Sequence, residues 1–215
     1  MRIAPEGRPF VGVSTAILAG LVGLELWRPG SWWMAAALWA PVAVWTPAFF
    51  RDPRRQGPRD ARLLLAPADG RVVSVVDVHE PEFVRGPATR VSVFMNVFNV
   101  HINYYPASGV VAYRNYRPGA FLNATLDKAS EKNEQMSLGI QTERGPILVR
   151  QIAGLVARRI VTDPTPGESV RQGDRLGLIR FGSRVDTFFP PHARAVVRVG
   201  DRTTGGVTVI GEWIQ

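Results

Sequence analysis

The sequence predicts a mainly β protein, in which a barrel-like or sandwich-like domain follows an N-terminal hydrophobic helical hairpin. Residues 10–50 carry only two charged side chains. From Arg62 onward, short runs rich in Val, Ile and Phe are separated by Gly, Pro, Asp or Asn, which is typical of strands joined by turns. We therefore expect two domains: residues 1–60, a membrane-anchoring hairpin with a basic linker, and residues 61–215, a β domain.

Two apolar stretches, 10–27 and 31–50, make up the hairpin. As helices they would rise about 27 and 30 Å, close to the roughly 30 Å thickness of a bilayer's hydrocarbon core. Arg28–Gly30 between them contains Pro and Gly, a turn signal, and aromatic residues cluster at both ends, as at the two interfaces of a membrane. We expect membrane attachment, while Pro41 and Pro47 leave open whether the second helix spans the bilayer or only dips into it.

Arginines lie on both flanks of the hairpin and predict its orientation. They are Arg2 and Arg8 before it, and Arg51, Arg54, Arg55 and Arg59 after it. By the positive-inside rule, both flanks and the β domain are expected on the cytoplasmic side of the cell's inner membrane. Two alternatives remain: a cleaved signal peptide ending near the small residues 35–37, and a buried hairpin in a soluble core.

Composition narrows the possible chemistry and partners. The formal net charge is +8, which suits an anionic membrane leaflet or a nucleic acid. We see no aromatic stacking motif or recognition helix, so nucleic acid is not an expected partner. The absence of cysteine excludes disulfides, thiol nucleophiles and thiolate metal sites. Three histidines without an HExxH-type pair give no reason to expect a metal centre.

The β domain is expected to contain ten short strands and one polar segment. The strands are expected at 63–65, 71–78, 89–94, 109–113, 146–152, 155–161, 175–181, 185–189, 193–199 and 206–210. Residues 123–135 are polar and have no strand pattern, so they form either a short helix or a long functional loop. The spacing favours an all-β barrel or sandwich over alternating β–α units.

Four segments hold residues that could do chemistry, although each is a weak signal alone. Asp69-Gly70 is an ordinary hairpin-turn pair, and a lone histidine such as His101 is more often structural than catalytic. The segment 131–134 is a charge cluster of the kind usually found on a solvated face. Gly182-Ser183, between two predicted strands, indicates only a turn.

Together, in order and spacing, these segments resemble the phosphatidylserine decarboxylase family, in particular its short bacterial branch with a hydrophobic N-terminus. The motifs that carry the resemblance are PADG at 67–70, FNVHIN at 98–103, PASG at 106–109, EKNE at 131–134, QIAG at 151–154 and RFGSRVD at 180–186. The last motif is the most specific, since members of this family cleave themselves at such a Gly-Ser bond. The resemblance covers nearly the whole chain.

The resemblance implies a self-processing reaction at Gly182-Ser183. Ser183 would attack the carbonyl carbon of Gly182, with His101 as the expected base and Asp69 as the group that orients it. The choice of base stays open between His101 and Tyr104. Elimination would then separate residues 1–182 from residues 183–215 and leave a pyruvoyl group, a covalent form of pyruvate, in place of Ser183.

The same resemblance implies the later reaction and the partners. The pyruvoyl group would form a Schiff base with the amine of phosphatidylserine, and loss of CO2 would give phosphatidylethanolamine. The expected partners are phosphatidylserine, membrane lipids and the chain's own two fragments as a heterodimer, with a dimer of such heterodimers left open.

Three other functions remain as alternatives. The first is a pyruvoyl decarboxylase acting on another serine-headed lipid such as archaetidylserine. The second is a decarboxylase of a free amino acid, which would have no reason to carry a membrane hairpin. The third is a non-catalytic lipoyl-like module anchored to the membrane, although Lys128 and Lys132 lack the hairpin context of a lipoyl site.

Overall fold

A computed structural model describes residues 2–120, 133–154, 159–162, 164–180 and 182–214 of the chain. The chain divides into two compact units, Met1–Arg54 and Arg55–Gln215. The division falls inside the basic stretch that the sequence predicts as a linker.

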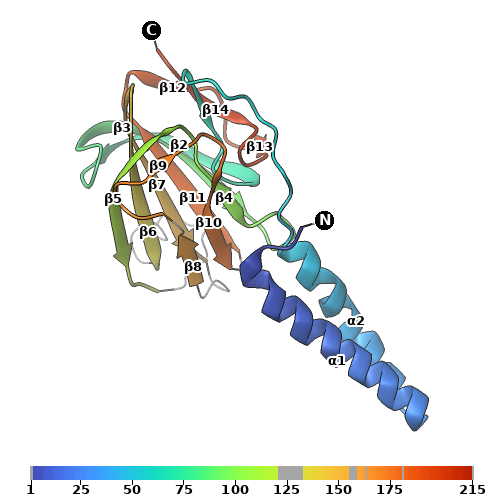
Figure 1. Cartoon of the computed structure of the whole chain (residues 1–215). Coiled ribbons are helices and arrows are strands. Elements are labelled where there is room, and N and C mark those ends of the chain that lie inside the picture. The colour runs from blue at the N-terminus through green and yellow to red at the C-terminus, as the bar shows by residue number, and fades with distance from the viewer. Residues whose placement is uncertain (1, 121–132, 155–158, 163, 181, 215) are drawn as a thin grey trace. The chain divides into compact units, whose positions relative to one another are not determined.

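The first unit is a helical hairpin (Figure 1). A short 3-10 helix, Pro5–Gly7, leads into α1, Arg8–Trp27, and α2 follows as Trp32–Phe49. The helices are joined by the indole N–H of Trp39, which donates to the carbonyl of Ser14 at 3.0 Å. The predicted hairpin is therefore confirmed, with helix bounds within two residues of those expected.

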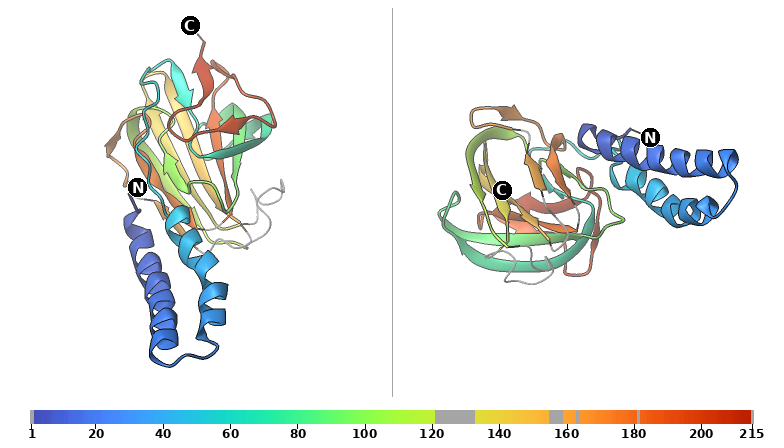
Figure 2. Two further views of the ribbon diagram at one scale, coloured as in Figure 1. Left: turned by 90° about the vertical axis from the view of Figure 1, so that its right-hand side faces the viewer. Right: turned by 90° about the horizontal axis from the view of Figure 1, so that it is seen from below.

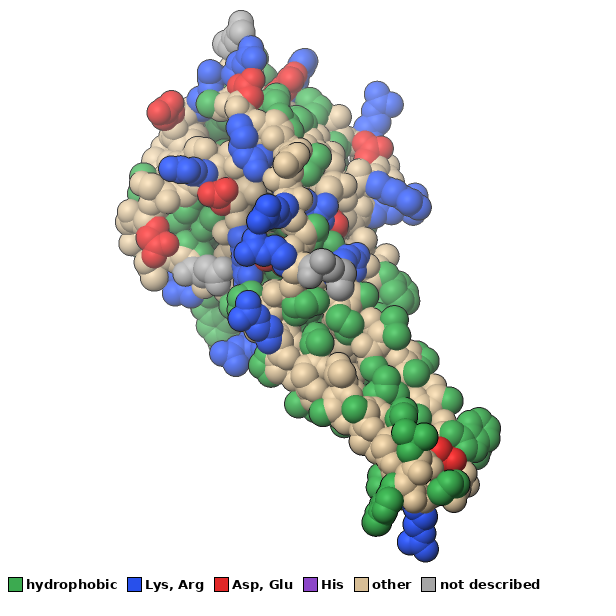
Figure 3. Space-filling model, turned by 45° about the vertical axis from the view of Figure 1, so that its right-hand side comes forward, with side chains coloured by type: hydrophobic (Ala, Val, Ile, Leu, Met, Phe, Trp, Pro, Cys, Tyr) green, Lys and Arg blue, Asp and Glu red, His purple; other side chains and the backbone are tan. Residues whose placement is uncertain are grey.

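The hairpin surface is mostly apolar on the face shown in Figure 3, with charged side chains at its tip. Glu25 has a local structural role there, because its carboxylate accepts hydrogen bonds from the backbone N–H groups of Gly30 and Trp33 at the start of α2. In the described part of the chain, one helix, Pro5–Trp27, has the length and mean hydropathy (1.8) expected of a membrane-crossing helix. That finding is compatible with the predicted membrane attachment.

The second unit is a β domain whose strands curl around a common interior (Figure 2). Its main sheet has eight strands in the order β13-β2-β3-β11-β7-β6-β5-β9, and all neighbouring pairs are antiparallel. These strands are β2 (Gly70–Glu80), β3 (Gly86–Met95), β5 (Gly109–Arg117), β6 (Gln135–Thr142), β7 (Gly145–Ala153), β9 (Ser169–Val170), β11 (Ser183–Phe189) and β13 (Arg202–Thr203).

Two three-stranded sheets complete the domain, in the orders β1-β14-β12 and β4-β10-β8. Their strands are β1 (Leu63–Leu65), β4 (Ile102–Tyr104), β8 (Arg159–Thr162), β10 (Arg175–Arg180), β12 (Ala193–Ala195) and β14 (Val209–Trp213). Side chains from all three sheets, including Leu64, Val93, Ile140 and Leu176, form one buried apolar core. The mainly β fold class predicted from the sequence is confirmed.

Strand β11 holds the central place in this arrangement. It pairs with β3 along one edge and with β7 along the other, so that Ser183 lies opposite both Met95 and Ala153. Side chains alternate along the strand, and Val185 and Phe189 point into the main core. Ser183 has the same parity as these two residues and therefore faces the same interior.

The structure corrects several predicted strand bounds. Strands β4, β6, β9 and β13 were not expected, the strand predicted at 193–199 ends at residue 195, and the one predicted at 206–210 is β14, at 209–213. Ser183 begins a strand, although the sequence predicted a turn there. Residues 155–158 of one expected strand and most of the polar segment 123–135 lie outside the described residues.

The β2–β3 hairpin is held by a buried carboxylate at its turn. Glu80 accepts hydrogen bonds from the backbone N–H groups of Glu82, Phe83 and Val84 at 2.8 to 3.0 Å. The guanidinium of Arg150 on β7 lies 3.5 Å from the same carboxylate. One acidic side chain thus satisfies three backbone donors that the turn would otherwise leave unpaired.

Candidate active site

The Gly182-Ser183 bond lies at the entry to the central strand. Gly182 has φ +58°, in the left-handed region that residues with a Cβ enter only at a cost. Ser183 is fully buried, and no described residue forms a hydrogen bond with its Oγ. Three other hydroxyls in the described residues share this state, so the feature that singles out this serine is its place after Gly182 in the RFGSRVD motif.

His101 lies beside this bond and is also fully buried. The backbone N–H of Gly182 donates to Nε2 of His101 at 3.3 Å, while Nδ1 lies 3.1 Å from the carbonyl oxygen of Asn99. A backbone N–H can only donate and a carbonyl can only accept, so the proton of a neutral ring is on Nδ1 and Nε2 carries a lone pair. The nitrogen that contacts Gly182 is therefore the one with the lone pair.

Local hydrogen bonds hold the segment that carries His101. Asn99 and Asn96 form a compact turn, in which Oδ1 of Asn99 accepts from the N–H of Asn96 at 2.9 Å. Strand β4 then pairs with β10, and the N–H of Ile179 donates to the carbonyl of His101 at 3.3 Å. Since β10 leads directly towards Gly182, this pairing brings the FNVHIN and RFGSRVD motifs together.

Asp69 lies at the same end of the sheet as Ser183. Arg71 and Arg184 both pair with Phe94 of the intervening strand β3, and β2 and β11 run in the same direction. Since neighbouring strands are about 4.8 Å apart and β3 lies between β2 and β11, Asp69 and Ser183 are roughly 10 Å from each other. The structure thus brings Asp69 to the region of the Gly182-Ser183 bond.

The contacts of Asp69 differ from those expected of a residue that orients His101. Its carboxylate accepts two hydrogen bonds from Nη2 of Arg55, at 2.7 and 2.8 Å, and one from the N–H of Gly205 at 2.8 Å. Among the described residues no hydrogen bond joins Asp69 to His101. The orienting role of Asp69 stays a prediction, and any effect of its charge on His101 acts through space.

Tyr104, the alternative base, belongs to the cluster around Asp69. Nε of Arg55 donates to the hydroxyl of Tyr104 at 3.4 Å, and the tyrosine ring packs against Gly205. Burial lowers the pKa of Arg55, but the hydrogen bond that Arg55 donates to Tyr104 and the charge of Asp69 outweigh this effect and raise that pKa above its usual value. Arg55 therefore keeps its charge at any practical pH, and of the two candidate bases it is His101 that contacts Gly182.

A chain of polar side chains runs from the half-buried Thr162 to the fully buried Asn103 near the site. The hydroxyl of Thr162 donates to Oε1 of Gln151 at 2.7 Å, and Nε2 of Gln151 donates to Oδ1 of Asn103 at 2.7 Å. Sequence reasoning missed these side chains and Arg55 as functional candidates. A signal was present for two of them, because Asn103 lies in the FNVHIN motif and Gln151 in the QIAG motif.

Two charged residues of the RFGSRVD segment form a buried pair. Nε and Nη2 of Arg184 lie 2.8 and 2.9 Å from the two carboxylate oxygens of Asp186. Both residues are at most 1% exposed. Because they alternate with Ser183 and Val185 along β11, they occupy the opposite face of the sheet from the serine and hold the strand in register.

The other two histidines lie away from this site. His79 is exposed on β2, and His192 stacks on Trp213 with ring centroids 5.2 Å apart. In the described ranges, no group of three or more His, Asp or Glu side chains is placed to hold a metal ion. Glu131 and Lys132 of the EKNE motif lie outside the described residues, while Asn133 donates to the carbonyl of Ala153 opposite Ser183.

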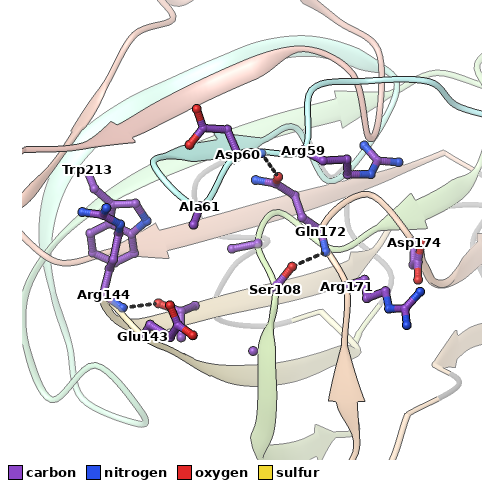
Figure 4. Close-up of a pocket in the computed structure, with 13 residues that line it drawn as sticks. Arg59, Asp60, Ala61, Ser108, Glu143, Arg144, Arg171, Gln172, Asp174 and Trp213 are labelled. Atoms are coloured by element: carbon purple, nitrogen blue, oxygen red, sulfur yellow. Dashed lines mark hydrogen bonds between the residues drawn. The ribbon is translucent and has the colours of Figure 1, made fainter.

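A cavity of about 570 Å³ lies elsewhere in the β domain (Figure 4). Its lining includes Arg144, in the turn before β7, and Ser108 and Gln172, which are joined by a 2.9 Å hydrogen bond. Ser183 pairs with the last residue of β7, and nine residues of extended strand span about 27 Å. This cavity is therefore at the opposite end of the sheet from the Gly182-Ser183 bond.

Fold and site together define a class of protein: a mainly β enzyme, preceded by an apolar helical hairpin, with a buried histidine beside an internal Gly-Ser bond. The sequence model of phosphatidylserine decarboxylase matches residues 43–211. The chain belongs to the phosphatidylserine decarboxylase family.

Three similar proteins, each named phosphatidylserine decarboxylase proenzyme, extend the match over nearly the whole chain. The protein of Symbiobacterium thermophilum is 48% identical over 99% of this chain and 96% of its own length. The protein of Gluconacetobacter diazotrophicus is 46% identical over 96% of this chain and 92% of its own length. The protein of Magnetococcus marinus is 43% identical over 97% of this chain and 94% of its own length. The resemblance found in the sequence motifs is thus confirmed.

Proposed function

We propose that this chain cleaves itself between Gly182 and Ser183 and that the mature enzyme converts phosphatidylserine to phosphatidylethanolamine and CO2. The observation that supports this most directly is the contact of His101 Nε2 with the N–H of Gly182, at 3.3 Å, next to an unpartnered serine hydroxyl. Family membership supports the choice of substrate.

The self-cleavage needs a base, a nucleophile and a bond that can be approached. His101 takes the proton of Ser183 Oγ, which attacks the carbonyl carbon of Gly182. The C–N bond breaks, the proton passes to the leaving nitrogen, and an ester replaces the peptide. Loss of the α-proton of Ser183 then expels the Gly182 carboxylate, and hydrolysis of the resulting enamine releases ammonia and leaves a pyruvoyl group at position 183.

The position of Ser183 suits such a group. The serine is enclosed at the start of a central strand, with a basic nitrogen nearby and no competing hydrogen bond on its Oγ in the described structure. A pyruvoyl group here would supply a carbonyl that takes up the substrate amine and withdraws electrons as CO2 leaves. His101 would then hold or deliver a proton beside it, and the buried surroundings would exclude water.

The two fragments are proposed to remain together as a heterodimer. Residues 183–215 carry β11 to β14, and β11 pairs with β3 and β7 of the longer fragment along both edges. Strands β13 and β14 pair with β2 and β1, which also belong to the longer fragment. Separation would expose the common core, so no covalent link is needed to hold them.

Self-cleavage is tested by intact mass measurement of the purified protein. The wild-type chain should appear as fragments 1–182 and 183–215, the shorter one blocked at its N-terminus, while Ser183→Ala stays a single 23.7 kDa chain. Ser92→Ala is a matched control, because Ser92 is equally buried and its hydroxyl also lacks a partner among the described residues. An active wild-type preparation made only of intact chain contradicts the proposal.

The substrate is tested with detergent-solubilised wild-type protein and mixed micelles of defined lipid. Phosphatidylserine should yield phosphatidylethanolamine and CO2, and Ser183→Ala should yield neither. Free serine in the same micelles should release no CO2, since the chain carries an apolar hairpin suited to a lipid substrate. Decarboxylation of free serine at an equal rate would contradict the lipid assignment.

We also propose that the hairpin anchors the enzyme in the inner membrane with the β domain on the cytoplasmic side. Support comes from the length and hydropathy of Pro5–Trp27 and from the arginines that follow α2. High salt should leave the protein in the membrane fraction, because it screens only the charges, and detergent should release it. Release by salt alone would contradict the anchor.

A further inference from the structure

The buried polar chain beside the site has a fixed direction. Thr162 donates its hydroxyl proton to Oε1 of Gln151, which leaves Nε2 of Gln151 to donate to Oδ1 of Asn103. Both distances are 2.7 Å. The two side-chain amides are therefore oriented by their hydrogen bonds, and the NH2 group of Asn103 is directed away from Gln151.

That NH2 group lacks a good acceptor. Among the described residues its one hydrogen-bond contact is the thioether sulfur of Met95, at 3.7 Å, and a thioether is a weak acceptor. Asn103 is fully buried, so water does not take the place of a partner at its surface. A buried donor left in this state destabilises the fold.

Met95 places this donor next to Ser183. The two residues are direct cross-strand partners on β3 and β11, and both face the interior of the domain. Side chains in such pairs have Cβ atoms roughly 4.5–5.5 Å apart. The NH2 group of Asn103 and the hydroxyl of Ser183, each without a good partner, thus flank the same methionine.

From this arrangement we propose that Nδ2 of Asn103 donates a hydrogen bond to the oxyanion that forms on the Gly182 carbonyl oxygen when Ser183 attacks. The inference rests on the proposed self-cleavage and adds a catalytic residue to it. As the Oγ–C bond forms, the carbonyl electron pair moves to oxygen, where a donor that is already oriented stabilises it without reorganisation. When the C–N bond breaks, the pair returns to the carbonyl and the nitrogen leaves with the proton from His101.

Gln151 and Thr162 have positioning roles in this scheme. Gln151 contacts Asn103, and Thr162 contacts Gln151. In this way the two residues hold the Asn103 amide so that its oxygen faces Gln151 and its nitrogen is left for the reacting bond. The arrangement explains why amide and hydroxyl side chains occupy an otherwise apolar interior next to Ser183.

The test uses Asn103→Asp, which retains an oxygen to accept from Gln151 and removes the donor. Purified precursor is followed by mass, with and without hydroxylamine, which splits esters but leaves peptide bonds intact under mild conditions. Loss of one oxyanion donor typically slows a reaction by about 10²–10³-fold. We expect cleavage of Asn103→Asp to slow by this factor and its uncleaved chain to resist hydroxylamine, because the ester does not form. Thr162→Val, which keeps the donor but loosens it, should slow cleavage less.

Folding is checked separately by thermal unfolding of Asn103→Asp in the uncleavable Ser183→Ala chain. A transition close to that of Ser183→Ala alone assigns the slow cleavage to chemistry, whereas its loss shows that Asn103 serves the fold and contradicts the proposal. Cleavage of Asn103→Asp at the wild-type rate, or accumulation of a chain that hydroxylamine splits at Gly182, also overturns it. Failure of the wild-type chain to cleave would instead contradict the proposed function itself.

Discussion

Replacement of His101 by glutamine tests the chemical role of this side chain with little change in shape. The side-chain oxygen of glutamine can accept the hydrogen bond that Gly182 donates to Nε2, but it cannot take the proton of Ser183. General-base assistance is worth about 10²–10⁴ in rate, or roughly 2.7–5.4 kcal/mol of activation free energy. The ring is fully buried, and its unprotonated nitrogen contacts Gly182. The cleavage half-time should therefore lengthen by a factor in this range.

The assay is the time course of precursor loss, read by intact mass, for wild type and His101→Gln. His192→Gln is the matched control, since His192 stacks on Trp213 and accepts no contact from Gly182. It should mature at the wild-type rate. If His101→Gln also matures at that rate while remaining folded, His101 is not the base, and Tyr104→Phe becomes the next variant to measure.

Three further predictions concern other parts of the β domain. Arg55→Ala removes two hydrogen bonds from Asp69, so in the Ser183→Ala chain we expect urea unfolding to show a loss of about 1–3 kcal/mol in the free energy of unfolding. In an otherwise wild-type chain it should slow cleavage, and Arg55→Lys should lie closer to wild type. Unchanged values of both quantities would refute the role of this pair. Gly182→Ala places a Cβ where φ is +58°, at a cost of about 1–2 kcal/mol, so cleavage should slow roughly 5- to 30-fold. Gly182→Asn should slow cleavage less, because asparagine tolerates this conformation. Equal cleavage rates for the two variants would contradict the conformational argument. Glu80→Ala leaves three backbone donors without their carboxylate, and urea unfolding should show a loss of about 2–4 kcal/mol in the free energy of unfolding. Glu168 is exposed, and Glu168→Ala should lower the same quantity by less than about 1 kcal/mol.

The sequence predicted the β domain well where strands follow a simple apolar pattern, and less well where the buried side chains of a strand are polar. Strand β6 was missed because polar residues share it with apolar ones and are buried too. Ser137, for example, accepts a hydrogen bond from Arg150 at 3.0 Å. Gly139 in the same strand lowers its strand propensity, but the ring of Phe83 lies 2.5 Å from where a Cβ would be. Such compensation depends on tertiary packing, which a local pattern does not contain.

Prediction of the site had a similar limit. The motifs named Ser183 and His101, and the structure brings His101 into contact with Gly182, from which it is separated by 81 positions. The partners of Asp69 were not predictable, because no local pattern joins Arg55 to Asp69 or Asp69 to Gly205, which lies 136 positions further along the chain. Pairings of this kind are fixed by strand order and by the close approach of Tyr104 to Gly205.

The place of the Gly-Ser bond at the start of a central strand has a physical consequence for a chain that is cut there. Conversion of Ser183 to a pyruvoyl group removes one backbone N–H, so at most one ladder hydrogen bond is lost, worth about 0.5–1.5 kcal/mol. The rest of β11 stays paired, from Arg184 to Phe189 with β3 and from Arg184 to Phe188 with β7, and the buried Arg184–Asp186 pair lies immediately beyond the cut. A cut in the middle of β11 would instead divide the pairing with β3 and β7 and leave two short, unpaired strand ends in the core. Cleavage before the first residue of β11 would therefore create a new reactive end inside a fold that is already complete, and it would keep that end in the surroundings of Ser183.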